Sequence, residues 1–88
     1  MKLMMAILRK GDCEPVMQAL VEDDFRVTRV ASTGGFLRQG NVTLLIGTDE
    51  EKVERALEVI RTNTEDSSTH AQTRATVFVL DVAQFEQL

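Results

Sequence analysis

Residues 25 to 47 consist of two stretches in which apolar and polar side chains alternate, joined by a loop that is rich in glycine. Successive side chains of a β-strand point to opposite faces of the sheet. Arg26 and Thr28 therefore share one face of the first stretch, and Asn41 and Gly47 share one face of the second. The pattern predicts a strand–loop–strand hairpin whose polar groups can converge on one ligand, and the rest of the chain is expected to present it.

The segments on either side of this hairpin predict two helices and a strand. An apolar run at residues 2–8 has apolar side chains on both alternating sets, which is typical of a strand covered on both faces. Asp12 is expected to be the N-cap of a helix that runs to about residue 23. Thr48 and Glu51 have the spacing of a capping box at the start of a second helix.

A last strand is predicted at residues 73–80, which are rich in β-branched side chains and follow a polar loop. The order strand, helix, strand, strand, helix, strand is that of a ferredoxin-like α+β sandwich (βαββαβ), with both helices on one face of the sheet. All of residues 1–88 are expected to form this single domain. The tail, with Phe85 and Leu88, is expected to pack back on the sheet.

The sheet face that the helices leave bare is expected to be apolar. The residues assigned to it are Met4, Leu8, Leu45, Phe78 and Leu80. A soluble monomer rarely exposes so large an apolar set, and a domain of 88 residues gains stability from oligomerisation. The sequence therefore predicts that this face is a subunit interface.

Composition excludes several functions. A net charge of -4 argues against binding to a nucleic acid polymer, which needs a continuous basic surface. No apolar run approaches the roughly 20 residues of a membrane span. The single Cys13 cannot form an internal disulfide, so nothing indicates an oxidising compartment, and a cytoplasmic protein is expected.

Few residues could carry out catalysis. The chain has one His, one Cys, no Tyr and no Trp, and it lacks a nucleophile motif. His70 and Cys13 do not have a metal-ligand spacing, and the acids at 49–51 are what the dipole of a helix N-terminus favours. The sequence predicts no enzyme activity, no metal and no cofactor.

The loop of the hairpin suits a nucleotide. Gly35 and its neighbours free backbone amides to approach an anion, and Arg26 can supply positive charge. Phe36 and Leu37 are apolar where exposure is expected, and an aromatic ring there can stack on a base. Asn41 can read a base edge. An equally supported alternative is that the glycines serve only the turn and the aromatic residue fills a subunit contact.

The stretch 25–47, FRVTRVASTGGFLRQGNVTLLIG, resembles the PII-like cyclic-di-AMP receptor family of bacteria. The start MKLMMAI, the strand ATVFVL from Ala75 and the tail segment QFEQ from Gln84 carry the same likeness. The resemblance implies a cytoplasmic homotrimer of ferredoxin-like subunits, a cyclic dinucleotide in each cleft between subunits, no catalysis and an unidentified downstream protein.

Carried over by the resemblance, the ligand-binding residues are Arg26, Thr28, Gly35, Phe36, Leu37, Asn41, Gly47, Phe78 and Gln87, with Phe78 and Gln87 contributed by a neighbouring subunit or the tail. The loop at 31–40 is expected to become ordered on binding, and that change is the expected signal.

The chain also departs from the family pattern. Only about ten residues, 63–72, replace the long loop that usually precedes the last strand, so this is a short variant. Asp81 stands where the family tends to have Pro, and Ser32 and Val42 stand where it tends to have Thr. The alternative is therefore a trimer that has lost cyclic-di-AMP, or is tuned to another nucleotide or a metal, and acts as a protein interaction module.

Overall fold

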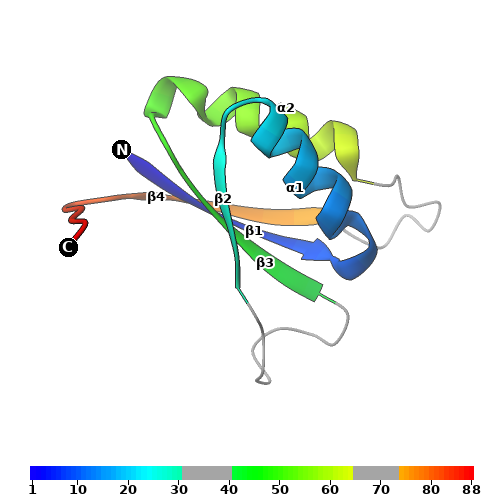
Figure 1. Ribbon diagram of the computed structural model, residues 1–88. Helices are drawn as coiled ribbons and strands as arrows, with labels where there is room; N and C mark the ends of the chain where they lie inside the picture. Colours follow the sequence, from blue (N-terminus) through cyan, green and yellow to red (C-terminus); the bar gives the residue numbers. More distant parts are fainter. Residues whose placement is uncertain (31–40, 65–73) are drawn as a thin grey trace.

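The computed structural model describes residues 1–30, 41–64 and 74–88, and it is a two-layer sandwich (Figure 1). Two helices cover one face of a four-stranded sheet, and both termini lie at the same end of that sheet. This confirms the predicted α+β ferredoxin-like arrangement. The elements are β1 (Lys2–Arg9), the 3-10 turn η1 (Lys10–Asp12), α1 (Cys13–Glu22), β2 (Arg26–Val30), β3 (Asn41–Thr48), the 3-10 turn η2 (Glu50–Lys52), α2 (Val53–Asn63) and β4 (Ala75–Asp81).

The strands lie in the order β2-β3-β1-β4, and every neighbouring pair is antiparallel. The central strands β1 and β3 are the two longest, and the edge strands β2 and β4 are the most exposed. A central strand makes hydrogen bonds along both edges, whereas an edge strand makes them along one. The sheet is therefore best supported at β1 and β3.

The core lies between the sheet and the two helices. The side chains of Met4 and Leu8 on β1 are at most 1% exposed, and they pack in one cluster with residues of both helices, such as Leu20 and Ile60. The prediction that Met4 and Leu8 lie on the bare face of the sheet was wrong. Both alternating sets of β1 are apolar, so the sequence did not decide which set faces the helices.

Both predicted helix caps differ from the structure. Asp12 does precede α1, but its side chain caps no backbone amide; it is buried and accepts a hydrogen bond from Arg9 Nε at 3.1 Å. Thr48 is the last residue of β3, and the turn η2 separates it from α2, so it forms no capping box. A 3-10 turn leads into each helix in place of the expected caps.

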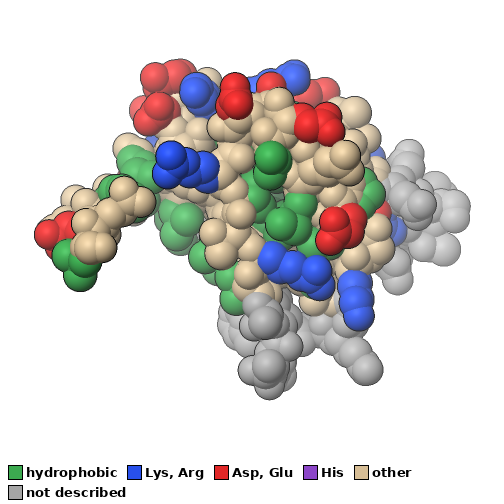
Figure 2. Space-filling view, viewed as in Figure 1, with side chains coloured by type: hydrophobic (Ala, Val, Ile, Leu, Met, Phe, Trp, Pro, Cys, Tyr) green, Lys and Arg blue, Asp and Glu red, His purple; other side chains and the backbone are tan. Residues whose placement is uncertain are grey.

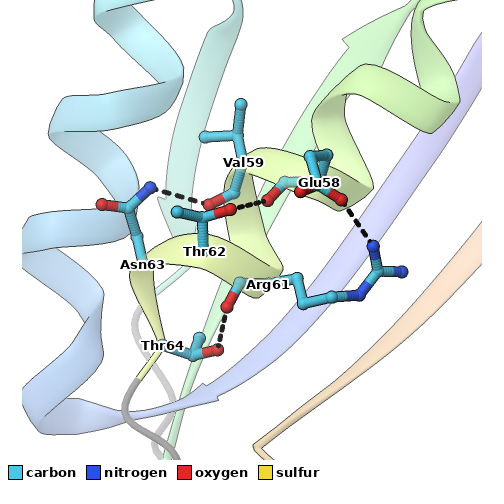
Figure 3. Close-up of polar contacts among 6 residues, drawn as sticks. All are labelled: Glu58, Val59, Arg61, Thr62, Asn63 and Thr64. Atoms are coloured by element: carbon cyan, nitrogen blue, oxygen red, sulfur yellow. Dashed lines mark hydrogen bonds and ion pairs between the residues drawn. The ribbon is translucent and has the colours of Figure 1, made fainter.

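At the C-terminus of α2, polar side chains form hydrogen bonds with backbone carbonyls, as Figure 3 shows. Thr62 Oγ1 donates to the Glu58 carbonyl at 2.8 Å, and Asn63 Nδ2 donates to the Val59 carbonyl at 2.8 Å. The hydroxyl of Thr64, one residue beyond the helix, donates to a carbonyl of the last turn at 3.2 Å. Of these acceptors, the carbonyl of Arg61 is among the last four of the helix, which have no intrahelical amide partner, so the Thr64 hydroxyl satisfies one of them. The bonds of Thr62 and Asn63 go to carbonyls one turn earlier and hold these two side chains against the helix.

The turn after α1 is tightly constrained. Asp24 has a φ of 66°, in the left-handed region, and the amide of Phe25 donates to the Leu20 carbonyl at 2.9 Å. The preceding residue, Asp23, accepts a hydrogen bond from Arg55 Nε of α2 at 2.6 Å. The turn thus ties α1 to α2 and delivers the chain to the start of β2.

We expect Asp24→Ala to lower the free energy of unfolding by about 1 kcal/mol, because a left-handed residue with a Cβ and no side-chain oxygen is strained. Asp24→Gly removes the same carboxylate without that strain and is expected to stay within roughly 0.5 kcal/mol of the unmodified protein. Urea denaturation of both variants measures the difference. Equal loss in the two variants would mean that the carboxylate, and not the backbone, stabilises this turn.

Candidate ligand site

The polar residues predicted on the hairpin lie on the bare face of the sheet. Arg26 of β2 is opposite Gly47 of β3, and Thr28 is opposite Leu45. Leu45 is also opposite Met5, which alternates with the buried Met4, so this whole set faces away from the helices. The sequence thus placed Arg26, Thr28 and Gly47 together correctly on one face.

Asn41 lies on the same face but at the far end of β3, where it pairs with Arg9. Asn41 and Gly47 are six positions apart along β3, which is about 20 Å at the rise of a strand. Within one chain, Asn41 and Arg26 therefore do not meet at one point, although they share a face.

Phe78 is on the bare face too, two strands away from the hairpin. It pairs with Met5 across β4 and β1, and the row continues through Leu45 to Thr28. Three strand spacings separate Phe78 from Thr28, about 14 Å. Phe78 is 50% exposed.

An open hollow of about 280 Å³ brings three predicted residues together: Arg26, Gly47 and Gln87. It lies where β2 begins and β3 ends, and the C-terminal segment 82–88 forms part of its wall. Figure 2 shows that segment standing out from the body of the domain at the left of the view. The other lining residues are Met1, Asp24, Phe25, Thr48, Asp49, Lys52 and Phe85.

Charges of both signs line the hollow. Arg26 and Lys52 are cationic, and Asp24 and Asp49 are anionic. Sequence reasoning missed Lys52, whose place follows from the turn η2 between the end of β3 and α2. A guanidinium offers a planar fork of donors that suits a phosphate, so the hollow can hold an anionic group beside Arg26.

Gly47 lines the hollow without a side chain that could fill it. A Cβ at this position would come within 3.1 Å of the Met1 methyl group, Cε. That distance is tight but involves the flexible end of a side chain, so a larger residue at position 47 would require the Met1 side chain to shift. Glycine at position 47 therefore leaves space beside Arg26.

The C-terminal segment is anchored where it leaves β4. Lys2 Nζ donates to Asp81 Oδ1, and the amide of Val82 donates to the Met1 carbonyl at 3.2 Å. The hydrogen bond and charge of Lys2 lower the pKa of Asp81, and Asp81 raises the pKa of Lys2. Beyond Val82, Phe85 is 60% exposed and Leu88 is fully exposed, so the prediction that they pack back on the sheet was wrong.

The bare sheet face is apolar at its centre. Leu3, Met5 and Ile7 alternate with the buried set of β1 and are half-buried, and Phe78 and Leu80 of β4 lie in the same rows with 50% and 44% exposure. These β1 residues take the place that the sequence had assigned to Met4 and Leu8. A continuous apolar surface on the bare face thus remains, with different members.

Three of the predicted residues, Gly35, Phe36 and Leu37, lie outside the described residues, and so does the loop 31–40 that contains them. In the described ranges, no three His, Cys, Asp or Glu side chains lie close enough together to hold a metal ion. Among the helices that the structure describes, none is long and apolar enough to cross a membrane. Cys13 is buried, with Sγ 3.7 Å from Met17 Sδ.

Comparisons with known proteins agree with these features. A family model described as "Cyclic-di-AMP receptor" matches residues 1–74. The fold is similar to the crystal structure of a functionally unknown protein from Pediococcus pentosaceus ATCC 25745, with a TM-score of 0.78 and 36% sequence identity. That match covers 99% of this chain and 96% of the other.

The ion pair at the start of the tail gives a pH prediction. The stabilisation of the folded state by the Asp81 carboxylate is fully present above its ordinary pKa of 3.8. It is lost as the pH falls through the lowered pKa of Asp81 in the folded protein. The stabilisation by the Lys2 ammonium group is fully present below its ordinary pKa of 10.5, and it is lost as the pH rises through the raised pKa of Lys2 in the folded protein. The protection of the Val82 amide against hydrogen exchange, corrected for intrinsic rates, is therefore expected to be constant from about pH 5 to about pH 9.

Asp81→Asn, which removes the charge and keeps the shape, is the matched variant for this measurement. It is expected to lower the protection of Val82 across the same pH range, as followed by nuclear magnetic resonance. If Asp81→Asn leaves that protection unchanged, the ion pair does not hold the tail.

Proposed function

Because this chain belongs to the cyclic-di-AMP receptor family, we propose that it is a non-enzymatic receptor that binds cyclic-di-AMP. The observation that carries the proposal is the meeting of Arg26, Gly47 and Gln87 in one hollow, since the resemblance assigns all three to the ligand. They come from β2, β3 and the tail, so only the folded chain brings them together. A bound cyclic dinucleotide would place a phosphate at Arg26.

The proposed site is shared between subunits of a homotrimer. A hollow of about 280 Å³ is slightly smaller than typical ligand pockets of about 300 to 1,000 Å³, which bury most of the ligand. Asn41 and Phe78 lie outside this hollow. Asn41 is about 20 Å from Gly47 along β3, and Phe78 is three strand spacings from β2 across the sheet. A neighbouring copy can bring the equivalents of such distant residues to the same ligand.

The bare sheet face supplies the surface for this assembly. Its centre is formed by Leu3, Met5 and Ile7, and Leu80 continues it onto the edge strand. Burying apolar area at about 25 cal/mol per Å² is the main driving force for association, and a monomer would leave this area in water. Packing against further copies is the arrangement we propose.

Removal of a ligand-facing cation tests the site. Arg26→Ala is expected to weaken cyclic-di-AMP binding by about 1 to 3 kcal/mol, the range for a lost charged hydrogen bond. Arg29→Ala is the matched control, because Arg29 is on the same strand and exposed but pairs with Leu44, whose side chain faces the helices. Asn41→Ala is expected to weaken binding as Arg26→Ala does.

Calorimetry with cyclic-di-AMP, cyclic-di-GMP, ATP and AMP measures these affinities and the selectivity together. The proposal predicts heat with cyclic-di-AMP and much weaker binding of the other three. No heat with cyclic-di-AMP would refute it, and equal affinity for all four would favour a receptor for another nucleotide.

A charge on the bare face tests the trimer. Leu80→Glu is expected to shift the molar mass measured by light scattering from three chains toward one, because a buried carboxylate without a partner is costly. Val21→Glu adds the same charge at a residue of α1 that is 57% exposed, and it is expected to remain trimeric. A monomeric unmodified protein at micromolar concentration would contradict the proposed assembly.

A further inference from the structure

The segment 82–88 is the most exposed apolar part of the described chain. It forms neither strand nor helix, and its only backbone hydrogen bond to the rest of the domain among those described is from Val82 to Met1. Phe85 and Leu88 in this short segment are both large, apolar and exposed. Exposed apolar side chains are common when they stand alone, so what lies next to each of them decides whether it has a function.

The two exposed residues differ in what lies next to them. Phe85 lines the hollow that contains Arg26, Gly47 and Gln87, whereas Leu88 does not. The ring of Phe85 is 60% exposed although it forms part of a concave surface. It therefore borders the hollow without being covered by its own chain.

The walls of the hollow carry complementary chemistry. Arg26 of β2 and Lys52 of the turn η2 form a cationic side, with the acids Asp24 and Asp49 nearby in the same lining, and the tail contributes the aromatic ring of Phe85 and the amide of Gln87. A ligand that joins a phosphate to a purine has an anionic part for the first side and a flat apolar part for the second. Stacking of a base on an aromatic ring is tolerant of the base and requires only an accessible ring face.

We propose that Phe85 is a ligand-contacting residue, and that a purine ring of the bound nucleotide packs against it so that the tail closes the hollow. This inference rests on the proposed function and extends it to a residue that the resemblance did not assign. The hydrogen bond from Val82 and the ion pair of Asp81 fix the start of the segment, which keeps Phe85 at the wall of the hollow.

Two alanine variants test the contact by calorimetry with cyclic-di-AMP. Phe85→Ala is expected to weaken binding by about tenfold or more, the scale of one base stacked on an aromatic ring. Leu88→Ala, which removes an exposed apolar side chain that does not line the hollow from the same segment, is expected to stay within about twofold of the unmodified protein. Both side chains are exposed, so neither change is expected to unfold the domain.

A fluorescence measurement tests the same contact by position. The chain contains no tryptophan, so Phe85→Trp gives a single fluorophore whose emission reports only this residue. Saturating cyclic-di-AMP is expected to change the emission of Phe85→Trp and to leave that of Leu88→Trp unchanged.

Three other outcomes would overturn the inference that Phe85 contacts the ligand. Unchanged affinity of Phe85→Ala in a protein that does bind cyclic-di-AMP refutes the contact and leaves the proposed function standing. Dissociation of the Phe85→Ala trimer in light scattering identifies Phe85 as a subunit contact in place of a ligand contact. Absence of binding by the unmodified protein refutes the receptor proposal, and the contact with it.

Discussion

The pairing register of β1 with its two neighbours determines the role of nearly every side chain in the sheet. Met5 lies opposite Leu45 on one side and opposite Phe78 on the other. A shift by one residue would exchange the two faces of β1 and expose Met4 and Leu8, which are now the centre of the core. Because both sets of β1 are apolar, the bare face would stay apolar after such a shift, but with Met4, Ala6 and Leu8 in place of Leu3, Met5 and Ile7.

Sequence reasoning succeeded where polar and apolar residues alternate and failed where they do not. In β2 and β3 the alternation is clear, so the grouping of Arg26 with Thr28 and Gly47 could be predicted. In β1 both sets of side chains are apolar, and only the pairing with β3 shows which set is buried. The order of the elements, by contrast, needs only the periods of the segments, and it was predicted correctly.

The parts of the site that the sequence did not reveal depend on contacts between segments that are distant along the chain. Lys52 reaches the hollow because a 3-10 turn, and not a capping box at Thr48, starts the second helix. Phe85 reaches the hollow because the amide of Val82 forms a hydrogen bond with the carbonyl of Met1. The sequence of η2 contains no signal for which side chain faces the hollow, and the contact of Val82 with Met1 joins residues that are distant along the chain.

One row of paired residues in the sheet joins the hollow to the apolar bare face. Arg26 pairs with Gly47, Gly47 with Leu3, and Leu3 with Leu80, so one row runs from the charged hollow to the exposed edge strand. A second copy packed on Leu3 and Leu80 would support the strand that carries Gly47, and a ligand at Arg26 would support the same strand from its other side. Ligand binding and assembly would then stabilise each other by equal free energies, because coupling between two binding events is reciprocal. A receptor built in this way would read its ligand through the stability of its own subunit contacts.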